Sequence, residues 1–239
     1  MSNCGYLGAA GQALPVLSTA DQERDLLKRK FLSSAVMHGA KTIRIRRQRN
    51  VYMCGDQDQE IYWIQKGYVK LIMTSREGKE CILDIYAPGD FFGESCLAGL
   101  EFRVETATAM ENVILKSITC QLFMADLNDA ELLAFIREIN KRNVEKHLLI
   151  SDMVTLGSEL RLGRALLRLG SRLGRRLPSG TLIDCKISQE DLSRMVGTTR
   201  PRVTEFMSRF RRMNLIQLNT ERQILLKEGR LMAYLSSIA

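Results

Sequence analysis

The arginines between residues 187 and 212 are the side chains of this sequence best suited to binding another molecule. Arg200, Arg202 and Arg209 recur, together with Glu205, on one side of a segment whose other side is apolar. A guanidinium can form two parallel hydrogen bonds with O6 and N7 of guanine, which a lysine ammonium cannot do. A single arginine of this kind usually belongs to a solvated helix face, but the cluster favours contact with duplex DNA.

Two short helices joined by a glycine turn would position these arginines. Ser188 and Asp191 have the spacing of a capping box, in which a hydroxyl and a carboxylate bind free amides at a helix start. Gly197 permits a tight turn, Thr199 is an N-cap for the second helix, and Pro201 falls in its first turn, where a missing N–H is tolerated. The second helix has one apolar stripe, formed by Val203, Phe206, Met207 and Phe210. This pattern is typical of a helix-turn-helix, whose second helix lies in the major groove.

The side chains expected to contact DNA fall into two groups. Three are expected to read base edges: Arg200, Arg202 and Glu205. Four are expected to contact phosphates, which fix the position of the protein without carrying sequence information. These are Ser188, Gln189, Thr199 and Arg209.

The distribution of charge supports the same interpretation. The chain has 239 residues and a formal net charge of +8, and it is long enough to form two hydrophobic cores. From Glu159 onward there are 16 Lys and Arg against 7 Asp and Glu, whereas residues 1–158 hold 19 and 20. The excess positive charge therefore lies in the last third of the chain, as expected of a part that neutralises phosphates.

Several classes of protein are disfavoured by what the sequence lacks. No apolar run approaches the roughly 20 residues that span a bilayer, and the N-terminus has no basic segment before an apolar one, so a cytoplasmic protein without a membrane partner is expected. No metal site is expected, because the two histidines are far apart and the six cysteines form no C-x-x-C pair: Cys4, Cys54, Cys81, Cys96, Cys120 and Cys185. With no catalytic triad or phosphate loop either, the chain is not expected to be an enzyme.

The order of sequence patterns predicts an α+β protein. Short alternating runs from Lys41 to Cys120 indicate a closed roll or sandwich, preceded by a short helix that Thr19 caps. Two apolar runs at 215–218 and 223–226 indicate a hairpin wing after the helix-turn-helix. The predicted parts are a flexible tail (1–20), a double-stranded β-helix, or β-roll, of the jelly-roll kind (21–125), a dimerisation helix (126–157) and a winged helix-turn-helix (158–239).

The long helix is expected to pair with a second copy of itself. Residues 126–157 contain no proline, and their apolar positions follow a near-heptad spacing: Leu132, Ile136, Ile139, Ile150 and Met153. Asn143 and Lys146 interrupt that seam, and polar residues in such a position can fix the register of a pair. A helix lying alone against the roll is the alternative. Pairing is preferred because recognition of an operator usually needs two half-sites.

From about residue 21 to 239 the sequence also resembles the CRP/FNR-type bacterial transcription regulators. The most specific parts are the run from Pro88 to Glu94 (PGDFFGE), Arg103 nine residues beyond Glu94, and residues 187–215. In members that bind cyclic nucleotides, the segment matching Gly93-Glu94-Ser95 cradles the ligand. Its glutamate binds the ribose 2′-hydroxyl, and the arginine matching Arg103 pairs with the phosphate.

The residues around this segment depart from the cyclic-nucleotide pattern. Small residues usually follow the phosphate arginine, but here Val104 and Glu105 do, and the carboxylate would repel a phosphate or occupy Arg103. On the long helix, only Ser151 could replace the hydroxyls that contact adenine. The implied effector site therefore comprises Gly93, Glu94, Ser95, Arg103, Val104 and Ser151. The candidate ligands are cyclic AMP, cyclic GMP, cyclic di-GMP, another anion or none.

The recognition helix departs from the family pattern as well. The usual Gly-x-Ser-Arg-Glu-Thr-Val is here Gly-Thr-Thr-Arg-Pro-Arg-Val, from residue 197. Arg200 is retained and is expected to read guanine, whereas Pro201 replaces a glutamate that accepts a hydrogen bond from cytosine. Glu205 stands where the family has a later arginine. The resemblance implies a two-fold operator with an altered half-site, and RNA polymerase as a further partner.

Three alternatives remain open at this stage. The first is a regulator of the same fold that needs no effector. The second is one that responds to thiol oxidation at Cys96 or Cys54, against the simpler interpretation that the cysteines are buried reduced thiols. The third is an interaction module that uses the basic last third of the chain for RNA or membranes.

Overall fold

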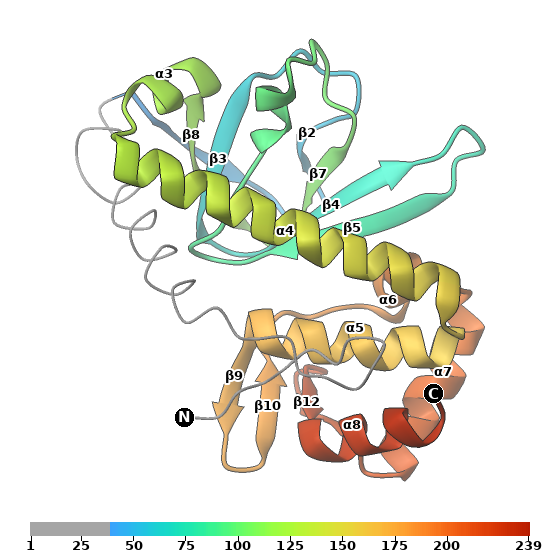
Figure 1. The fold of residues 1–239 in the computed structure, drawn as a ribbon. Helices are drawn as coiled ribbons and strands as arrows, with labels where there is room; N and C mark the ends of the chain where they lie inside the picture. Colours follow the sequence, from blue (N-terminus) through green and yellow to red (C-terminus); the bar gives the residue numbers. More distant parts are fainter. Residues whose placement is uncertain (1–38) are drawn as a thin grey trace.

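The computed structural model describes residues 39–239 (Figure 1). The predicted tail at 1–20 and the helix expected to begin at Thr19 lie outside the described residues. Nearest the N-terminus of the described part are two antiparallel four-stranded sheets, with strand orders β1-β8-β3-β6 and β2-β7-β4-β5. Their elements are β1 Lys41–Ile45, β2 Asn50–Tyr52, β3 Glu60–Lys66, β4 Val69–Thr74, β5 Glu80–Tyr86, β6 Phe91–Phe92, the 3-10 helix η1 Glu94–Ala98, β7 Thr106–Ala109 and β8 Val113–Thr119. The predicted β-roll is confirmed.

Strand β3 is buried on both faces because it lies between two apolar clusters. Tyr62 and Ile64 point between the two sheets, where the Tyr62 and Phe92 rings stack with their centres 5.2 Å apart. Ile61 and Trp63 alternate with them and pack toward the helices that follow the roll. The roll therefore has a second apolar surface that must be covered, and the helices after β8 cover it.

Two helices after β8 cover that surface: α3 (Cys120–Ala125) and α4 (Asp129–Thr155). The single helix predicted from residue 126 is wrong at its start, because Asp126 ends α3. Helix α4 begins at the next N-cap, Asn128, whose side chain accepts from the Glu131 amide while the Glu131 carboxylate accepts from the Asn128 amide. With 27 residues, α4 is about 40 Å long and extends beyond the roll toward the C-terminal unit (Figure 1).

The apolar face that α4 leaves exposed differs from the predicted seam. Ile136 and Ile150 are exposed as expected, but Ile139 packs against the roll, and Leu132 and Met153 are half-buried. The roll takes the face that carries Ala134, Phe135 and Arg142, and this rotates the outward face by about one residue. The outer stripe, as we call this face below, consists of Leu133, Ile136, Val144, Ile150 and Val154.

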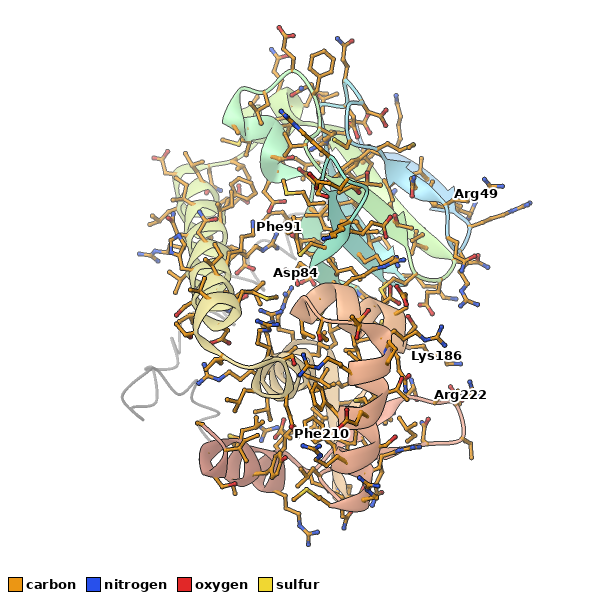
Figure 2. All side chains as sticks on the ribbon, turned by 90° about the vertical axis from the view of Figure 1, so that its right-hand side faces the viewer. Arg49, Asp84, Phe91, Lys186, Phe210 and Arg222 are labelled. Atoms are coloured by element: carbon orange, nitrogen blue, oxygen red, sulfur yellow. The ribbon has the colours of Figure 1, made fainter. Side chains whose placement is uncertain are left out.

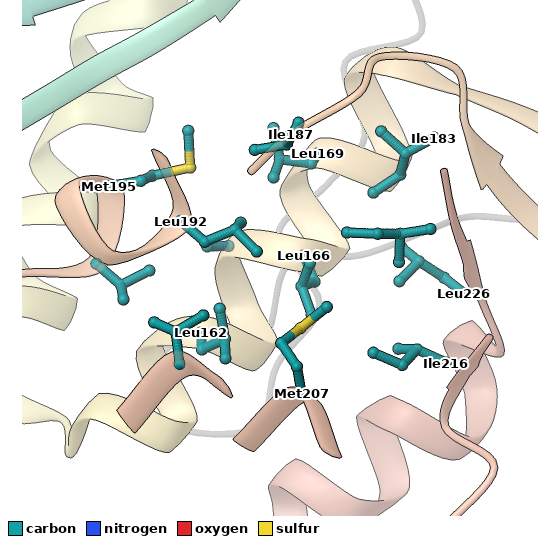
Figure 3. Close-up of a cluster of buried hydrophobic side chains, with 14 of the residues drawn as sticks. Leu162, Leu166, Leu169, Ile183, Ile187, Leu192, Met195, Met207, Ile216 and Leu226 are labelled. Carbon is teal, nitrogen blue, oxygen red and sulfur yellow. The ribbon is translucent and has the colours of Figure 1, made fainter. Parts of the chain in front are cut away.

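The C-terminal unit is a helix-turn-helix with a small sheet of order β11-β12-β10-β9. A hydrophobic core lies between its helices and this sheet (Figure 3), with Leu166, Met207 and Leu226 among the buried side chains. The predicted hairpin wing is confirmed by β11 and β12. The elements are α5 Ser158–Leu173, β9 Gly174–Leu177, β10 Gly180–Ile183, α6 Gln189–Val196, α7 Arg200–Arg212, β11 Ile216–Leu218, β12 Ile224–Leu226 and α8 Glu228–Ser237.

The C-terminal unit packs directly on the roll through α6 and β5. Ile82 and Ile85 of β5 belong to the same buried cluster as Leu192 and Met195 of α6. Charged pairs surround this contact: Lys70–Asp191 at 2.6 Å, Arg194–Glu80 at 2.5 Å and Arg172–Asp84. In Figure 2, Asp84 lies at the junction between the two units. The two units therefore share a core.

This contact changes the predicted capping box at the start of α6. The Ser188 hydroxyl accepts from the Asp191 amide at 3.0 Å, as expected. The Asp191 carboxylate, however, accepts from the Ser188 hydroxyl and from the Lys70 ammonium, each at 2.6 Å. The Asp191 carboxylate is therefore shared between the start of α6 and Lys70 of the roll.

Candidate DNA-binding surface and effector site

The turn between α6 and α7 positions the recognition helix as the sequence predicts. Gly197 has a left-handed backbone (φ 61°), which glycine adopts without strain. Thr199 is the N-cap of α7 in an extended conformation, and Pro201 lies in the first turn. The Thr199 hydroxyl forms no capping hydrogen bond, contrary to the prediction, and the residue is exposed.

The predicted base readers are exposed near the start of α7. Arg200 and Arg202 have no ion pair with any residue in the described part of the chain. The guanidinium carbon of Arg202 lies 5.9 Å from the centre of the Phe206 ring, so the apolar stripe of α7 supports its stem. Glu205 is exposed as well, and it pairs with Arg209 at 3.0 Å. The arginine donors that could bind base edges are therefore available.

The residues predicted to contact phosphates differ in their exposure and in their partners. Ser188 is exposed, and the Gln189 side-chain oxygen accepts from the Thr204 hydroxyl at 2.6 Å, which links α6 to α7. Lys186 and Arg222 lie on the same side of the C-terminal unit in Figure 2. Lys186, before α6, and Arg222, in the wing, are both exposed and add positive charge that the sequence interpretation left out.

Arg209 is half-exposed, and other side chains of the C-terminal unit pair with it. Its guanidinium pairs with Glu159 of α5 at 2.7 Å and with Glu205 at 3.0 Å, and the Tyr234 hydroxyl of α8 donates to Glu159 at 2.6 Å. Hydrogen bonding to Tyr234 and the charge of Glu159 raise the pKa of Arg209. Two carboxylates thus neutralise this arginine, so a phosphate contact would require an existing ion pair to open.

In the roll, Arg103 points into the protein. Its side chain is 1% exposed and donates to the carbonyl oxygen of Gly93 at 2.5 Å and to the Ser95 hydroxyl at 3.0 Å. It also donates to the Glu60 carbonyl oxygen and pairs with Asp58 at 3.4 Å, whereas its Nε has no hydrogen-bond partner. Both terminal nitrogens of the predicted phosphate ligand are therefore engaged by the chain itself.

Glu105 does not occupy Arg103, contrary to one of the two possibilities raised by the sequence. Its buried carboxylate accepts from the Tyr52 hydroxyl at 3.2 Å and from the Ser95 hydroxyl at 2.7 Å. Burial, followed by the charge of Glu105, raises the pKa of Tyr52 far above its ordinary value, so the phenol stays protonated as a donor. Asp58, rather than Glu105, is the carboxylate that pairs with Arg103.

Glu94 is also engaged, by a residue that the sequence interpretation missed. Arg142 of α4 donates to the Glu94 carboxylate at 3.3 Å and to the Phe91 carbonyl oxygen at 2.9 Å. Figure 2 places Phe91 between the roll and α4. A sequence signal was present, since Glu138 and Arg142 have the i,i+4 spacing of a helical ion pair and pair at 3.2 Å. That spacing could not reveal that the pair points into the roll.

The remaining predicted effector residues do not join this cluster. Val104 is 43% exposed, and Ser151 is exposed on α4. Ser151 lies nine residues beyond Arg142, which is about 13 Å along the helix axis. Among the six residues expected to form the site, the structure brings Gly93, Glu94, Ser95 and Arg103 together.

Two family models match the two units of the chain. Residues 42–128 match the model of the cyclic nucleotide-binding domain, and residues 160–234 match the model of the Crp-like helix-turn-helix domain. The chain belongs to the CRP/FNR family of transcription regulators. This CRP/FNR regulator therefore acts by binding DNA and is not an enzyme.

Individual relatives cover most of this CRP/FNR chain. It is 27% identical over 180 residues to the global nitrogen regulator of Synechococcus elongatus, covering 74% of the chain and 81% of the relative. It is 24% identical over 174 residues to the CRP-like cAMP-activated global transcriptional regulator of Mycobacterium tuberculosis, covering 72% and 78%. The structure of FixK2 from Bradyrhizobium japonicum shares the fold, with a TM-score of 0.71 at 17% identity, covering 81% and 96%.

The cyclic nucleotide implied by the fold does not fit the residues as this CRP/FNR regulator arranges them. Glu94 and Arg103, the groups expected to bind ribose and phosphate, are both paired within the chain. The backbone at Gly93 is closely packed too, since a Cβ there would lie 2.8 Å from the Glu60 carbonyl oxygen and 3.2 Å from Arg103. A bound phosphate would have to displace these contacts.

Two features are absent between residues 39 and 239. No three His, Cys, Asp or Glu side chains in that range gather closely enough to hold a metal ion. None of the helices in that range combines the length and apolar character needed to cross a bilayer.

Proposed function

We propose that the chain is a homodimeric regulator that binds a two-fold DNA operator in the cytoplasm through α7. The exposure of Arg200 and Arg202 at the start of α7, without ion pairs in the described part of the chain, is the observation that carries this proposal. With Glu205 they would read base edges, while Ser188, Gln189 and Thr199 would contact phosphates. We assign Arg209 to positioning α7, because Glu159 and Glu205 hold it.

The outer stripe of α4 supports dimer formation. Its five apolar side chains are 46–80% exposed, which is unusual for large apolar groups on one face of a helix. Leu133 and Val154 are three heptads apart, so a second copy of α4 could pack along the whole stripe. A two-fold axis there would present two α7 helices to half-sites about 34 Å apart.

The operator is found and tested by selection from randomised duplexes with the full-length protein. We expect enrichment of a two-fold site in which a guanine pairs with Arg200, and a half-site that differs from the family's usual one because Pro201 replaces glutamate. Enrichment without two-fold symmetry would contradict the dimer. Equal affinity for all duplexes and RNAs, with the same steep salt dependence, would instead support a non-specific nucleic-acid module.

The dimer is tested separately by Val154→Glu together with Ile150→Glu. Two carboxylates facing their copies across the seam would repel, so analytical ultracentrifugation should show a monomer and operator affinity should fall. Lys79→Glu, an exposed change in the turn between β4 and β5 and away from α4, is the matched control. A dimer that survives the double substitution would place the interface elsewhere.

Cys54, one of the two candidates for control by thiol oxidation, is exposed, whereas the structure gives little support to oxidation of the other, Cys96. Cys96 lies beside Cys120 in the cluster under α4, but burial raises the pKa of the Cys96 thiol to about 12. Burial likewise raises the pKa of Cys185 to about 12. Thiols with pKa values this high react slowly, because the thiolate is the nucleophile.

RNA polymerase remains a proposed partner. The position of the operator would then decide between activation and repression.

A further inference from the structure

The contact between Arg142 and Glu94 joins α4 to the roll at the place where the resemblance implies a ligand. Arg142 is 5% exposed. One terminal nitrogen donates to the Phe91 carbonyl oxygen and to the Glu94 carboxylate, and Nε donates to Glu138 of its own helix. The guanidinium carbon lies 4.1 Å from the centre of the Phe91 ring. A side chain of α4 thus binds groups of the roll on both sides of Gly93.

Arg142 differs from an arginine in a surface ion pair because its charged guanidinium is buried. Burial alone lowers the pKa of Arg142, but Glu94, Tyr86 and Glu138 raise it above the ordinary arginine value, so the guanidinium stays charged. A buried charge is tolerated only when other charges and hydrogen bonds compensate it. Two carboxylates and one carbonyl oxygen provide that compensation here, and removing Arg142 would take this donor away from all three.

Arg103 closes the other side of the same segment. It holds the Gly93 carbonyl oxygen and the Ser95 hydroxyl, while Glu105 accepts from the Ser95 hydroxyl. The backbone and side chains of residues 93–95 are therefore held by the chain on the roll side through Arg103 and on the α4 side through Arg142. A ligand that gated this site would have to displace these internal contacts, and their loss would reduce its differential affinity for the two states of the protein.

We infer that Arg142 takes the place of a ligand, linking the roll to α4 through Glu94 so that the protein binds its operator without a small effector. This rests on the proposed operator binding, because operator affinity is one of its readouts. Nucleotide binding by the roll is measured separately and does not depend on DNA.

The first experiment uses the full-length wild-type protein and cyclic AMP, cyclic GMP and cyclic di-GMP. Calorimetry should give no heat of binding for any of them. Operator affinity, measured by fluorescence anisotropy at fixed salt, should change by less than about twofold, whereas allosteric effectors typically change affinity about 5–150-fold. A nucleotide that binds and raises operator affinity about tenfold would overturn the inference and leave operator binding intact. Selection that enriches no sequence, with or without nucleotide, would overturn operator binding itself and this inference with it.

The second experiment breaks the link from either side. Arg142→Gln and Glu94→Gln should each lower operator affinity by about tenfold, and the double variant should lower it no further, because the two groups act as one unit. Circular dichroism establishes that each variant is folded at the assay temperature. The control is Lys79→Gln, which removes an exposed cation in the turn between β4 and β5 and should leave affinity unchanged.

The pattern of additivity distinguishes a link from general loss of stability. Additive losses, or wild-type affinity in both single variants, would show that the pair does not transmit the state of the roll to α4. If Arg142→Gln does not fold, Glu94→Gln and the wild-type calorimetry still decide the question.

Discussion

The arginines of the roll and those of the recognition helix have the same side chain in opposite surroundings. Arg103 and Arg142 are 2% and 5% exposed, and carbonyl oxygens and carboxylates of the chain receive their hydrogen bonds. Arg200 and Arg202 are exposed and have no ion pair in the described part of the chain. An arginine is therefore available to a ligand only when the fold leaves its donors unsatisfied. This difference supports the proposals that α7 recognises DNA and that the arginines of the roll have a structural role.

The largest effect that tests this comparison is on stability. Arg103→Ala should lower the free energy of unfolding by about 3–5 kcal/mol, because Asp58 and the carbonyl oxygens of Gly93 and Glu60 lose a buried partner. Arg202→Ala should change it by less than about 0.5 kcal/mol, as expected for an exposed side chain. Urea unfolding of both variants measures the difference. Equal effects would mean that Arg103 is not part of the core of the roll.

A smaller effect is expected where the two units meet. Lys70→Met should lower the free energy of unfolding by about 1.5–3 kcal/mol at pH 7, because it removes a charged hydrogen bond to Asp191. Lys66→Met, an exposed change at the end of β3, is the control. If Lys70→Met is as stable as the wild type, the units are held together without this ion pair, by packing such as that of Ile82 and Leu192.

The same pair should make stability depend on pH. Burial alone would raise the pKa of Asp191, but hydrogen bonds from Lys70 and Ser188 and the charge of Lys70 lower it overall. Because the folded-state pKa is depressed, the contribution is complete above the unfolded-state value of about 4 and is lost as the pH falls through the folded-state value. The difference between wild type and Lys70→Met should therefore shrink in acid. A difference that grows as the pH falls would contradict this assignment.

At the DNA surface the prediction concerns binding instead of folding. Arg200→Ala should cost about 1–3 kcal/mol of operator affinity and relax the preference at one base position, with unfolding unchanged. Anisotropy with the selected operator and with single-base variants of it measures both. Loss of affinity that is equal for all duplexes would make Arg200 a phosphate contact instead of a base reader.

The sequence predicts the recognition helix well because its signals are local. Ser188, Gly197 and Pro201 mark the helix ends within a few residues of each other, and the stripe of α7 follows from helical period alone. Local signals could not predict that side chains of the protein itself engage Glu94 and Arg103 in the roll. Arg142 is 48 residues from Glu94, and Arg103 is 43 residues from Glu60, so only the fold brings them together.

The outer stripe illustrates an intermediate case. The near-heptad period of α4 is visible in the sequence, but the period alone does not say which of two adjacent apolar faces the roll covers. Leu133 and Val154 are exposed, whereas Leu132 and Met153, one residue away, are half-buried. Because a helix advances about 100° per residue, an error of one position moves a side chain from the seam to the flank.

Arg209 gives the smallest predicted effect and the sharpest test, because it lies on α7 yet is paired like the arginines of the roll. A free phosphate contact contributes about 0.9 to the slope of log affinity against log salt. Glu159 and Glu205 neutralise Arg209 in the free protein, so Arg209→Gln should leave that slope unchanged. Glu159→Gln removes one carboxylate partner of Arg209 and should make the slope steeper. If Arg209→Gln instead flattens the slope by about 0.9, the ion pairs of Arg209 open on the operator. Pairing in the free protein would then not be enough to exclude an arginine from DNA contact.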